Sequence, residues 1–214
     1  MKKLYKGFAY LFVFMLMVSS CGKSDPVNQT ITLLGTESYI IPISEMIPDS
    51  LQETIPSLFG GFHEGFYPPN IEGEYTINKE FCHSNFIVDL SDSQDMHLRI
   101  TNQHNRVASV DFYEGFTVHC DTAFIMGSGS SFTLYFEEDR NMSFEDYHPY
   151  SKRGVVIKGE KTTEGIRNLQ YGNVILDAQN GGTPYLGLFV KGWYFIYKDR
   201  DGMACNDNWF DQHR

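Results

Sequence analysis

Apolar and polar residues alternate with a period of two along most of the chain from Ile71 onward. Successive side chains of a strand point to opposite faces, so this pattern predicts strands with one dry face and one wet face. His97 and Arg99, for example, fall on the wet face of the expected strand after Asp95. The apolar positions are Met96, Leu98 and Ile100; Ala108, Val110 and Phe112; Phe116, Val118 and Cys120; Phe132, Leu134 and Phe136; Val155 and Ile157; and Trp193, Phe195 and Tyr197.

Turn-forming residues interrupt this alternation about every ten to fifteen residues, as in antiparallel all-β proteins. We therefore predict an all-β domain over residues 70–214, an up-and-down barrel of about eight or nine strands rather than a jelly roll. A barrel of this size either holds one small ligand or is filled by its own side chains. The inward positions are dominated by Phe, which favours a filled interior.

A different pattern precedes the barrel, and it predicts a short helix in an N-terminal segment, residues 36–69. Asp49 is a suitable N-cap, with Gln52 three residues later as its capping-box partner. Pro56 limits the length of this helix. The side chains expected to pack on the barrel are Leu51, Ile55 and Leu58.

The first 21 residues have the form of a bacterial lipoprotein signal. Three lysines precede an apolar run, Phe8–Val18, that is too short to span a membrane. Small residues then lead to Cys21, whose thiol is the expected site of lipidation. We expect residues 1–20 to be removed as a signal peptide and residues 21–35 to serve as lipidated anchor and tether.

The charge composition of the chain limits the classes of partner that it can bind. Without the three leader lysines, 14 of the 17 basic residues remain against 27 acidic ones, a net charge of −13. An acidic surface repels phosphate backbones and anionic lipid, so nucleic acid is excluded as a partner and membrane attachment must come from the acyl chains. Gly22 does not resemble an inner-membrane retention signal, so we expect the outer membrane of the cell envelope, with its periplasmic or surface face left open.

Cysteine usage predicts at most one disulfide. Cys82, Cys120 and Cys205 remain beside the lipidated Cys21, and the expected compartment is oxidising. Three pairings are possible, and three buried thiols are the alternative. The first and last strands of a closed barrel are neighbours, which favours Cys82–Cys205.

The motifs for catalysis and metal binding are weak. Asp199 and Asp201 could begin a calcium loop, but Asp-x-Asp-Gly after an aromatic strand more often forms a plain turn. His97, His119 and Asp121 could bind zinc if their strands align. The acidic run Glu137–Asp139 is interpreted as a wet turn rather than a glycosidase pair. No nucleophile–base arrangement is present in the sequence, so neither an enzyme nor a cofactor is expected.

Exposed aromatic side chains are better candidates for contacting a ligand or partner, since tyrosine stacks on sugar rings and anchors protein interfaces. The alternative is that these rings pack against the N-terminal segment. The candidates are Tyr135, Tyr185 and Tyr194 on the wet faces of strands, and Tyr147 and Tyr150 in an expected loop.

Four segments resemble a group of Bacteroidota lipoproteins that have no assigned activity: Pro68–Tyr75, Gly127–Phe136, Gly159–Ile166 and Tyr197–Gly202. The resemblance implies a lipocalin-like barrel, in which the glycine of Gly73-x-Tyr75 permits a close approach. It implies no catalytic residues.

Together these features predict a non-enzymatic, lipid-anchored envelope protein that acts as an interaction or accessory module, with a protein or glycan partner. The alternative is a lipocalin-like carrier of a small apolar or amphipathic ligand.

Overall fold

The computed structural model describes residues 30–33, 36–39, 42–85, 95–114, 117–141, 150–179 and 190–212. The chain divides into two units, residues 1–40 and residues 41–214. In the first unit, β1 (Thr30–Leu33) and β2 (Thr36–Tyr39) form an antiparallel hairpin. The hairpin begins inside the segment 21–35, which the sequence predicts to be a tether.

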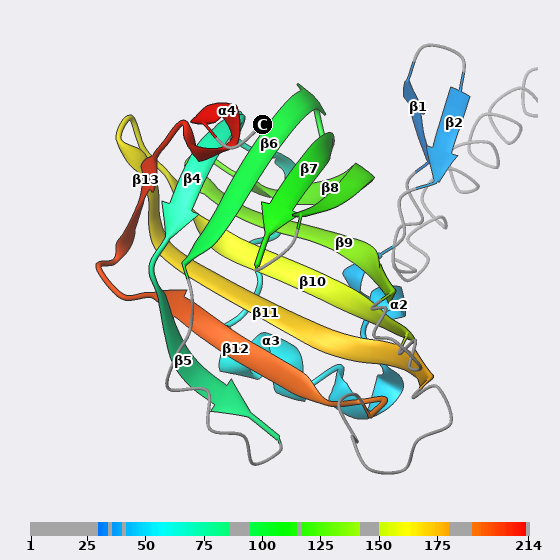
Figure 1. Ribbon diagram of the computed structural model, residues 1–214. Coiled ribbons are helices and arrows are strands. Elements are labelled where there is room, and N and C mark those ends of the chain that lie inside the picture. Colours follow the sequence, from blue (N-terminus) through cyan, green and yellow to red (C-terminus); the bar gives the residue numbers. More distant parts are fainter. Residues whose placement is uncertain are drawn as a thin grey trace, which may run out of the picture. The chain divides into compact units, whose positions relative to one another are not determined.

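The second unit is an all-β, antiparallel, barrel-like fold, which confirms the prediction from alternation (Figure 1). Its long strands are β6 (Met96–His104), β7 (Val107–Tyr113), β8 (Thr117–Ser128), β9 (Ser131–Asn141), β10 (Tyr150–Lys161) and β11 (Gly165–Gln179). The shorter ones are β3 (Phe66–Tyr67), β4 (Gly73–Ile77), β5 (Lys79–Ser84), β12 (Tyr194–Asp199) and β13 (Met203–Asn206).

Eight of these strands form a closed ring in nearly sequential order. The ring runs β4–β6–β7–β8–β9–β10–β11–β13 and returns to β4. Two short strands continue beyond strands of the ring. β5 follows β4 along the chain, and β12 precedes β13 and pairs with the same edge of β11. The ring is not a regular barrel.

The ring is complete at one end and split at the other. Met96 of β6 pairs with Ile77 at the end of β4, whereas β5 pairs with β12. Within the described residues, β5 therefore leaves the ring without pairing to β6 (Figure 1). We call this the open end. The connections that fall outside the described residues all join strands there: 86–94, 115–116, 142–149 and 180–189.

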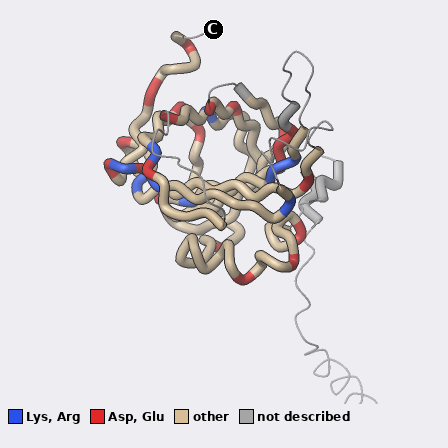
Figure 2. Tube along the Cα trace, turned by 60° about the horizontal axis from the view of Figure 1, so that its bottom comes forward, with Lys and Arg blue, Asp and Glu red and all other residues tan. Residues whose placement is uncertain are grey.

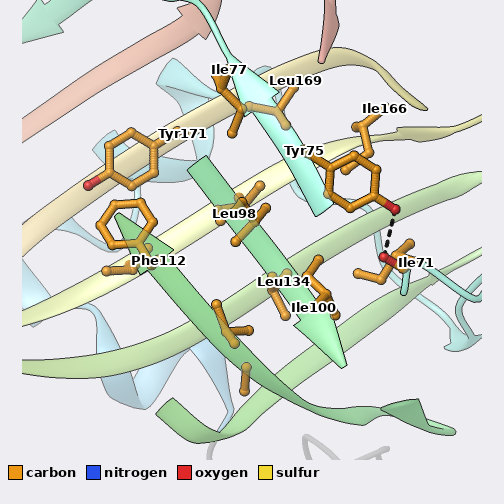
Figure 3. Close-up of a cluster of buried hydrophobic side chains, with 14 of the residues drawn as sticks. Ile71, Tyr75, Ile77, Leu98, Ile100, Phe112, Leu134, Ile166, Leu169 and Tyr171 are labelled. Carbon is orange, nitrogen blue, oxygen red and sulfur yellow. Dashed lines mark hydrogen bonds between the residues drawn. The ribbon is translucent and has the colours of Figure 1, made fainter. Parts of the chain in front are cut away.

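At the opposite, closed end, the chain before β4 seals the ring. Ile71 is fully buried, and its backbone N–H donates to Gln103 Oε1 at 2.8 Å. The Tyr75 hydroxyl donates to the Ile71 carbonyl at 2.8 Å and accepts from Lys161 Nζ at 2.9 Å (Figure 3). A Cβ on Gly73 would lie 2.8 Å from that hydroxyl, so the Gly-x-Tyr glycine does allow a close approach, by the tyrosine itself.

The core lies inside the ring and contains most of the inward residues that the period of two predicts, joined by residues of β4 and β11, such as Tyr171, that are not among the predicted positions. Tyr171 and Phe112 lie against each other in its middle, with ring centroids 5.5 Å apart (Figure 3). Large rings such as these contribute much of the buried apolar area, which drives folding at roughly 25 cal/mol per Å². Other fully buried members are Met96, Leu98, Ile100, Val110, Phe132, Leu134, Val155 and Ile157.

The N-terminal segment covers part of the outer wall. It contains α2 (Ile43–Met46), η1 (Asp49–Leu51) and α3 (Thr54–Leu58). The single short helix predicted from Asp49 onward is present as two short turns, η1 and α3. The predicted capping box does not form, because Asp49 lies inside η1, whose N-cap is Pro48 and has no side-chain cap hydrogen bond. Gln52 Nε2 instead donates to the Asp49 side chain, at Oδ1, at 3.0 Å. A Cβ on Gly172 would lie 2.8 Å from the Phe59 ring. The absence of a side chain at Gly172 therefore lets the N-terminal segment pack closely against the outer wall. The segment carries acidic and no basic residues (Figure 2).

A C-terminal turn, α4 (Trp209–Gln212), covers another part of the outer wall beside β4 and β6. Trp209 stacks on His97 with ring centroids 4.2 Å apart, and Phe210 is buried. The guanidinium of Arg99 lies 4.5 Å from the centroid of the Phe210 ring. The wet face of β6 is thus covered by the end of the chain.

Candidate functional site

The inward faces of four strands change from apolar to charged near the open end. The alternation that places apolar residues inside continues for one more step to Lys79, Glu114, Glu138 and Arg153. Lys79, Glu138 and Arg153 are each less than 5% exposed, and the Glu114 side chain is 18% exposed. We call these four residues the interior charge cluster.

The interior charge cluster is a chain of ion pairs. Lys79 Nζ lies 2.6 Å from Glu114 Oε1, and Glu114 Oε2 lies 3.8 Å from Arg153 Nη1. Arg153 Nη2 donates to both oxygens of Glu138, at 2.6 and 2.8 Å. Two cations and two carboxylates alternate, so the cluster is neutral when all four groups are ionised.

Burial makes the ionised groups of this cluster costly in free energy and makes their pKa values sensitive to their surroundings. Taking ions out of water costs several kcal/mol each, and only well-formed pairs offset that cost. Desolvation raises the pKa of Glu138 to about 7, although the attraction of Arg153 opposes the rise. Uptake of a proton by Glu138 near neutral pH gives the cluster a net positive charge.

Hydroxyl and amide groups surround the charges. Asn173 Nδ2 donates to the Tyr171 hydroxyl at 3.0 Å, and the Tyr171 and Tyr197 rings stack with centroids 5.7 Å apart. Lys79 Nζ lies 5.0 Å from the centroid of the Tyr197 ring. Burial raises the pKa of both tyrosines, so their hydroxyls stay protonated.

Three buried polar atoms beside the cluster have no hydrogen-bond partner within the described ranges: Ser151 Oγ, Arg153 Nε and Asn173 Oδ1. Ser151 and Arg153 are alternate residues of β10, and Asn173 lies opposite Val155 on the paired strand β11. Leaving such an atom unpaired costs about 1–3 kcal/mol. An occupant that offers both a donor and an acceptor would remove this cost.

Apolar side chains lie near the cluster. Phe81, on β5, is 37% exposed and lies edge-on to Tyr197 with centroids 5.8 Å apart. Val118, Cys120 and Phe195 pack partly buried against the core. Apolar and polar groups therefore lie side by side at this end of the ring, as they do in small-ligand sites.

The sequence does not predict this site. The prediction that Glu138 belongs to a wet acidic turn is wrong, because Glu138 is 2% exposed on the inward face of β9. The signal was present: Phe132, Leu134 and Phe136 point inward, and two residues further along the same strand comes Glu138.

The structure contradicts two of the five predicted tyrosine contacts. Tyr135 is 1% and Tyr194 5% exposed, so neither is available to a partner. Their rings lie against Phe124 and His83, with centroids 5.6 and 5.8 Å apart. Tyr150 is partly exposed, and its hydroxyl donates to Asp139 Oδ1 at 2.6 Å, which raises its pKa to about 12. Tyr147 and Tyr185 lie outside the described residues.

The metal candidates have other roles. Asp199 is buried, and its two oxygens accept from the backbone N–H groups of Asn78 and Met203 at 3.0 and 2.8 Å. Asp201 Oδ2 accepts from Asn78 Nδ2 at 3.4 Å. These contacts shape a turn. Within the described part of the chain, no group of three or more His, Cys, Asp and Glu is arranged to hold a metal ion.

The two candidate histidines are both on the wet face, as predicted, but they have different neighbours. His119 contacts Asp111 at 2.6 Å and Asp121 at 2.7 Å, and these hydrogen bonds raise its pKa. His97 instead stacks on Trp209 and contacts the Thr76 hydroxyl at 2.9 Å.

The predicted Cys82–Cys205 disulfide is absent, and Cys82, Cys120 and Cys205 are free. The first and last strands are neighbours, as expected, but their register separates the thiols. Cys205 pairs with Thr76, six residues before Cys82, which is about 20 Å along an extended strand. A disulfide needs Cα atoms within about 7 Å.

Comparisons with protein-family models, curated proteins and solved structures find no match to this chain. A search of the described residues for a helix long and apolar enough to cross a membrane finds none. Cys21 and the leader lie outside the described residues, so the lipoprotein signal stays a prediction.

Proposed function

We propose that this protein is a non-enzymatic, lipid-anchored binding module of the cell envelope that takes a small amphipathic molecule into the open end of its barrel. Lipidation of Cys21 would hold it at the outer membrane, as the leader predicts. The single observation that carries the proposal is the set of unpartnered buried atoms of Ser151, Arg153 and Asn173 beside the interior charge cluster.

The chemistry of the cluster favours an uncharged polar head group. While Glu138 is ionised the four charges cancel, so a charged head group would leave one ion without a partner. Arg153 Nε can only donate and Asn173 Oδ1 can only accept, so the head group should carry both functions, as a hydroxyl or primary amide does.

The apolar body of the ligand would lie at the rim, against Phe81 and Phe195. Large rings such as Phe132 and Phe136 fill the closed half of the ring, which favours shallow rather than deep binding.

Full-length lipidated protein in lipid nanodiscs can be titrated with two probes, 11-(dansylamino)undecanamide and 11-(dansylamino)undecanoic acid. Empty nanodiscs give the background. We expect enhanced, blue-shifted dansyl emission, with tighter binding of the amide. The double variant Ser151→Ala/Asn173→Leu should bind the amide about tenfold more weakly, the effect of losing about 1.4 kcal/mol. Thr122→Ala, exposed on β8, is the control.

Equal affinity of the wild type and the double variant for the amide would overturn the proposed site. Absence of binding of both probes to the wild type would overturn the proposed function. Circular dichroism of each variant establishes that a loss of binding is not a loss of fold.

One observation favours the second candidate, an accessory protein that docks on a partner. Phe66 and Tyr67 on β3 are 51% and 86% exposed, and adjacent exposed aromatic residues are typical of interface anchors. A photo-crosslinking amino acid at position 67 should yield an adduct of one defined mass in native envelopes. A probe placed at Gln179, exposed on β11, should not.

A further inference from the structure

A pocket lies on the outer wall, away from the open end, and the binding function proposed above does not use it. It has a volume of about 560 Å³ and lies where the end of α3 meets β10, β11 and β12. This volume is within the 300–1,000 Å³ typical of small-molecule sites. We call it the wall pocket.

A row of long polar side chains crosses the wall pocket. Lys158, Gln170 and Lys198 are successive partners across β10, β11 and β12, so they project side by side from the outer face. Lys158 Nζ donates to the carbonyl oxygens of Phe59 and Gly61 at 2.7 and 2.8 Å. These carbonyls follow the last turn of α3, so the ammonium group is fixed in place and has one further N–H to donate.

The rim of the wall pocket is also fixed. Asn168 adopts a left-handed backbone conformation with φ of 53°, which is uncommon for a residue other than glycine. Its N–H donates to the Gly202 carbonyl at 3.0 Å, which ties the turn after β12 to β11. The Asn168 side chain is exposed at the pocket, opposite the row of long side chains.

The charges that line the wall pocket cancel. Lys158, Lys198 and Arg200 are balanced by Glu160, Asp199 and Asp201, in a chain whose net charge is −10. The pocket therefore offers both hydrogen-bond donors and acceptors, and its balanced charges favour neither an anion nor a cation. The exposed Gly60, next to the buried Phe59, has no atom within 4 Å of its Cβ direction and adds a patch without a polar side chain.

We infer that the wall pocket binds a neutral saccharide of one or two rings. Ring hydroxyls both donate and accept, which matches the mixed lining, and the C–H face of a sugar suits the bare patch beside Phe59. A lipid tail would bury the polar groups of Gln170 and Asn168 without giving them hydrogen-bond partners, and an anion would meet as many acids as bases.

Saturation-transfer difference NMR on the full-length protein in nanodiscs tests this inference, with maltose, N,N′-diacetylchitobiose and glucuronate as probes. We expect transfer to at least one of the neutral disaccharides and weaker transfer to glucuronate. Gln170→Ala should weaken that binding by about fivefold, the usual effect of one lost hydrogen bond. Gln179→Ala removes the same side chain from the far end of β11 and should leave binding unchanged.

No transfer to either disaccharide, equal binding by Gln170→Ala, or preferential binding of glucuronate would each overturn the inference. These outcomes are independent of the open end, because Ser151→Ala/Asn173→Leu should bind the disaccharide like the wild type.

Discussion

Lys79 and Glu114 form an ion pair across the open end of the barrel, with Nζ and Oε1 2.6 Å apart. They belong to parts of the chain that do not pair as strands, because Lys79 begins β5 and Glu114 follows β7. The contact therefore ties the strand that leaves the ring to the strands that remain in it.

Lys79→Met should loosen β5. Loss of one partner of a largely buried hydrogen-bonded pair costs about 1–3 kcal/mol, and the loss should appear as faster hydrogen–deuterium exchange of the amides of β5. Lys198→Met is the matched control on the neighbouring strand, because Lys198 and Glu80 are both about half exposed. It should cost under about 1 kcal/mol. Equal exchange in both variants would contradict the bridging role.

The Arg153–Glu138 pair should behave as a coupled unit. Glu138→Leu leaves a buried guanidinium with a weakened set of partners and should destabilise the fold by about 3–5 kcal/mol in urea unfolding. Arg153→Met/Glu138→Leu removes both charges and should recover much of that loss. A double-mutant cycle with both single variants measures the coupling. Additive single effects would show that the two side chains do not stabilise each other.

Stability should depend on pH through Glu138. Its pKa is raised to about 7 in the folded protein and is near 4.3 in an unfolded chain. Between these values the folded state binds more protons, so the contribution of Glu138 to stability is complete below about pH 4.3 and falls as pH rises toward 7. Glu138→Gln should reduce this fall, measured by urea unfolding across the range. Glu137→Gln, on the outer face of β9, controls for removal of an acid.

The three free thiols should differ in reactivity. Cys82 and Cys205 are exposed, whereas Cys120 is partly buried and its pKa is raised by desolvation. Iodoacetamide reacts with the exposed thiolate, so Cys120 should be alkylated last in the folded protein. Peptide mass spectrometry after timed alkylation gives the order. A Cys82–Cys205 disulfide in protein purified without reductant would contradict the register described above.

The C-terminal turn should detach when its buried ring is removed. Phe210 is 6% exposed and holds α4 on the wall where Trp209 stacks on His97. Phe210→Ala should cost about 3–5 kcal/mol and shift Trp209 fluorescence to the red as the indole enters water. Gln212→Ala, exposed at the end of the same turn, should change neither. Trp193→Phe removes the other indole and makes the signal specific.

Much of the barrel interior could be predicted from the local alternation, including the charged residues that follow the apolar ones on the inward faces. A strand alternates its side chains whatever their chemistry, so the inward faces containing Ile77, Phe112, Phe136 and Val155 extend directly to charged residues. Glu138 was assigned to a wet turn because charge was given more weight than position in the alternation. The outer wall was harder to predict, since Tyr135 alternates like an exposed residue and is nevertheless buried, with its ring against Phe124 of the neighbouring strand.

The sequence by itself determined the all-β class, many of the strands and the face on which their alternating side chains lie, because these follow from the local geometry of the extended chain. Only the tertiary structure decided the register between the first and last strands, which keeps Cys82 and Cys205 apart. It also decided that β5 leaves the ring and that Lys79 and Arg153 meet through Glu114. These contacts join residues far apart in the chain, and they depend on how the whole ring closes.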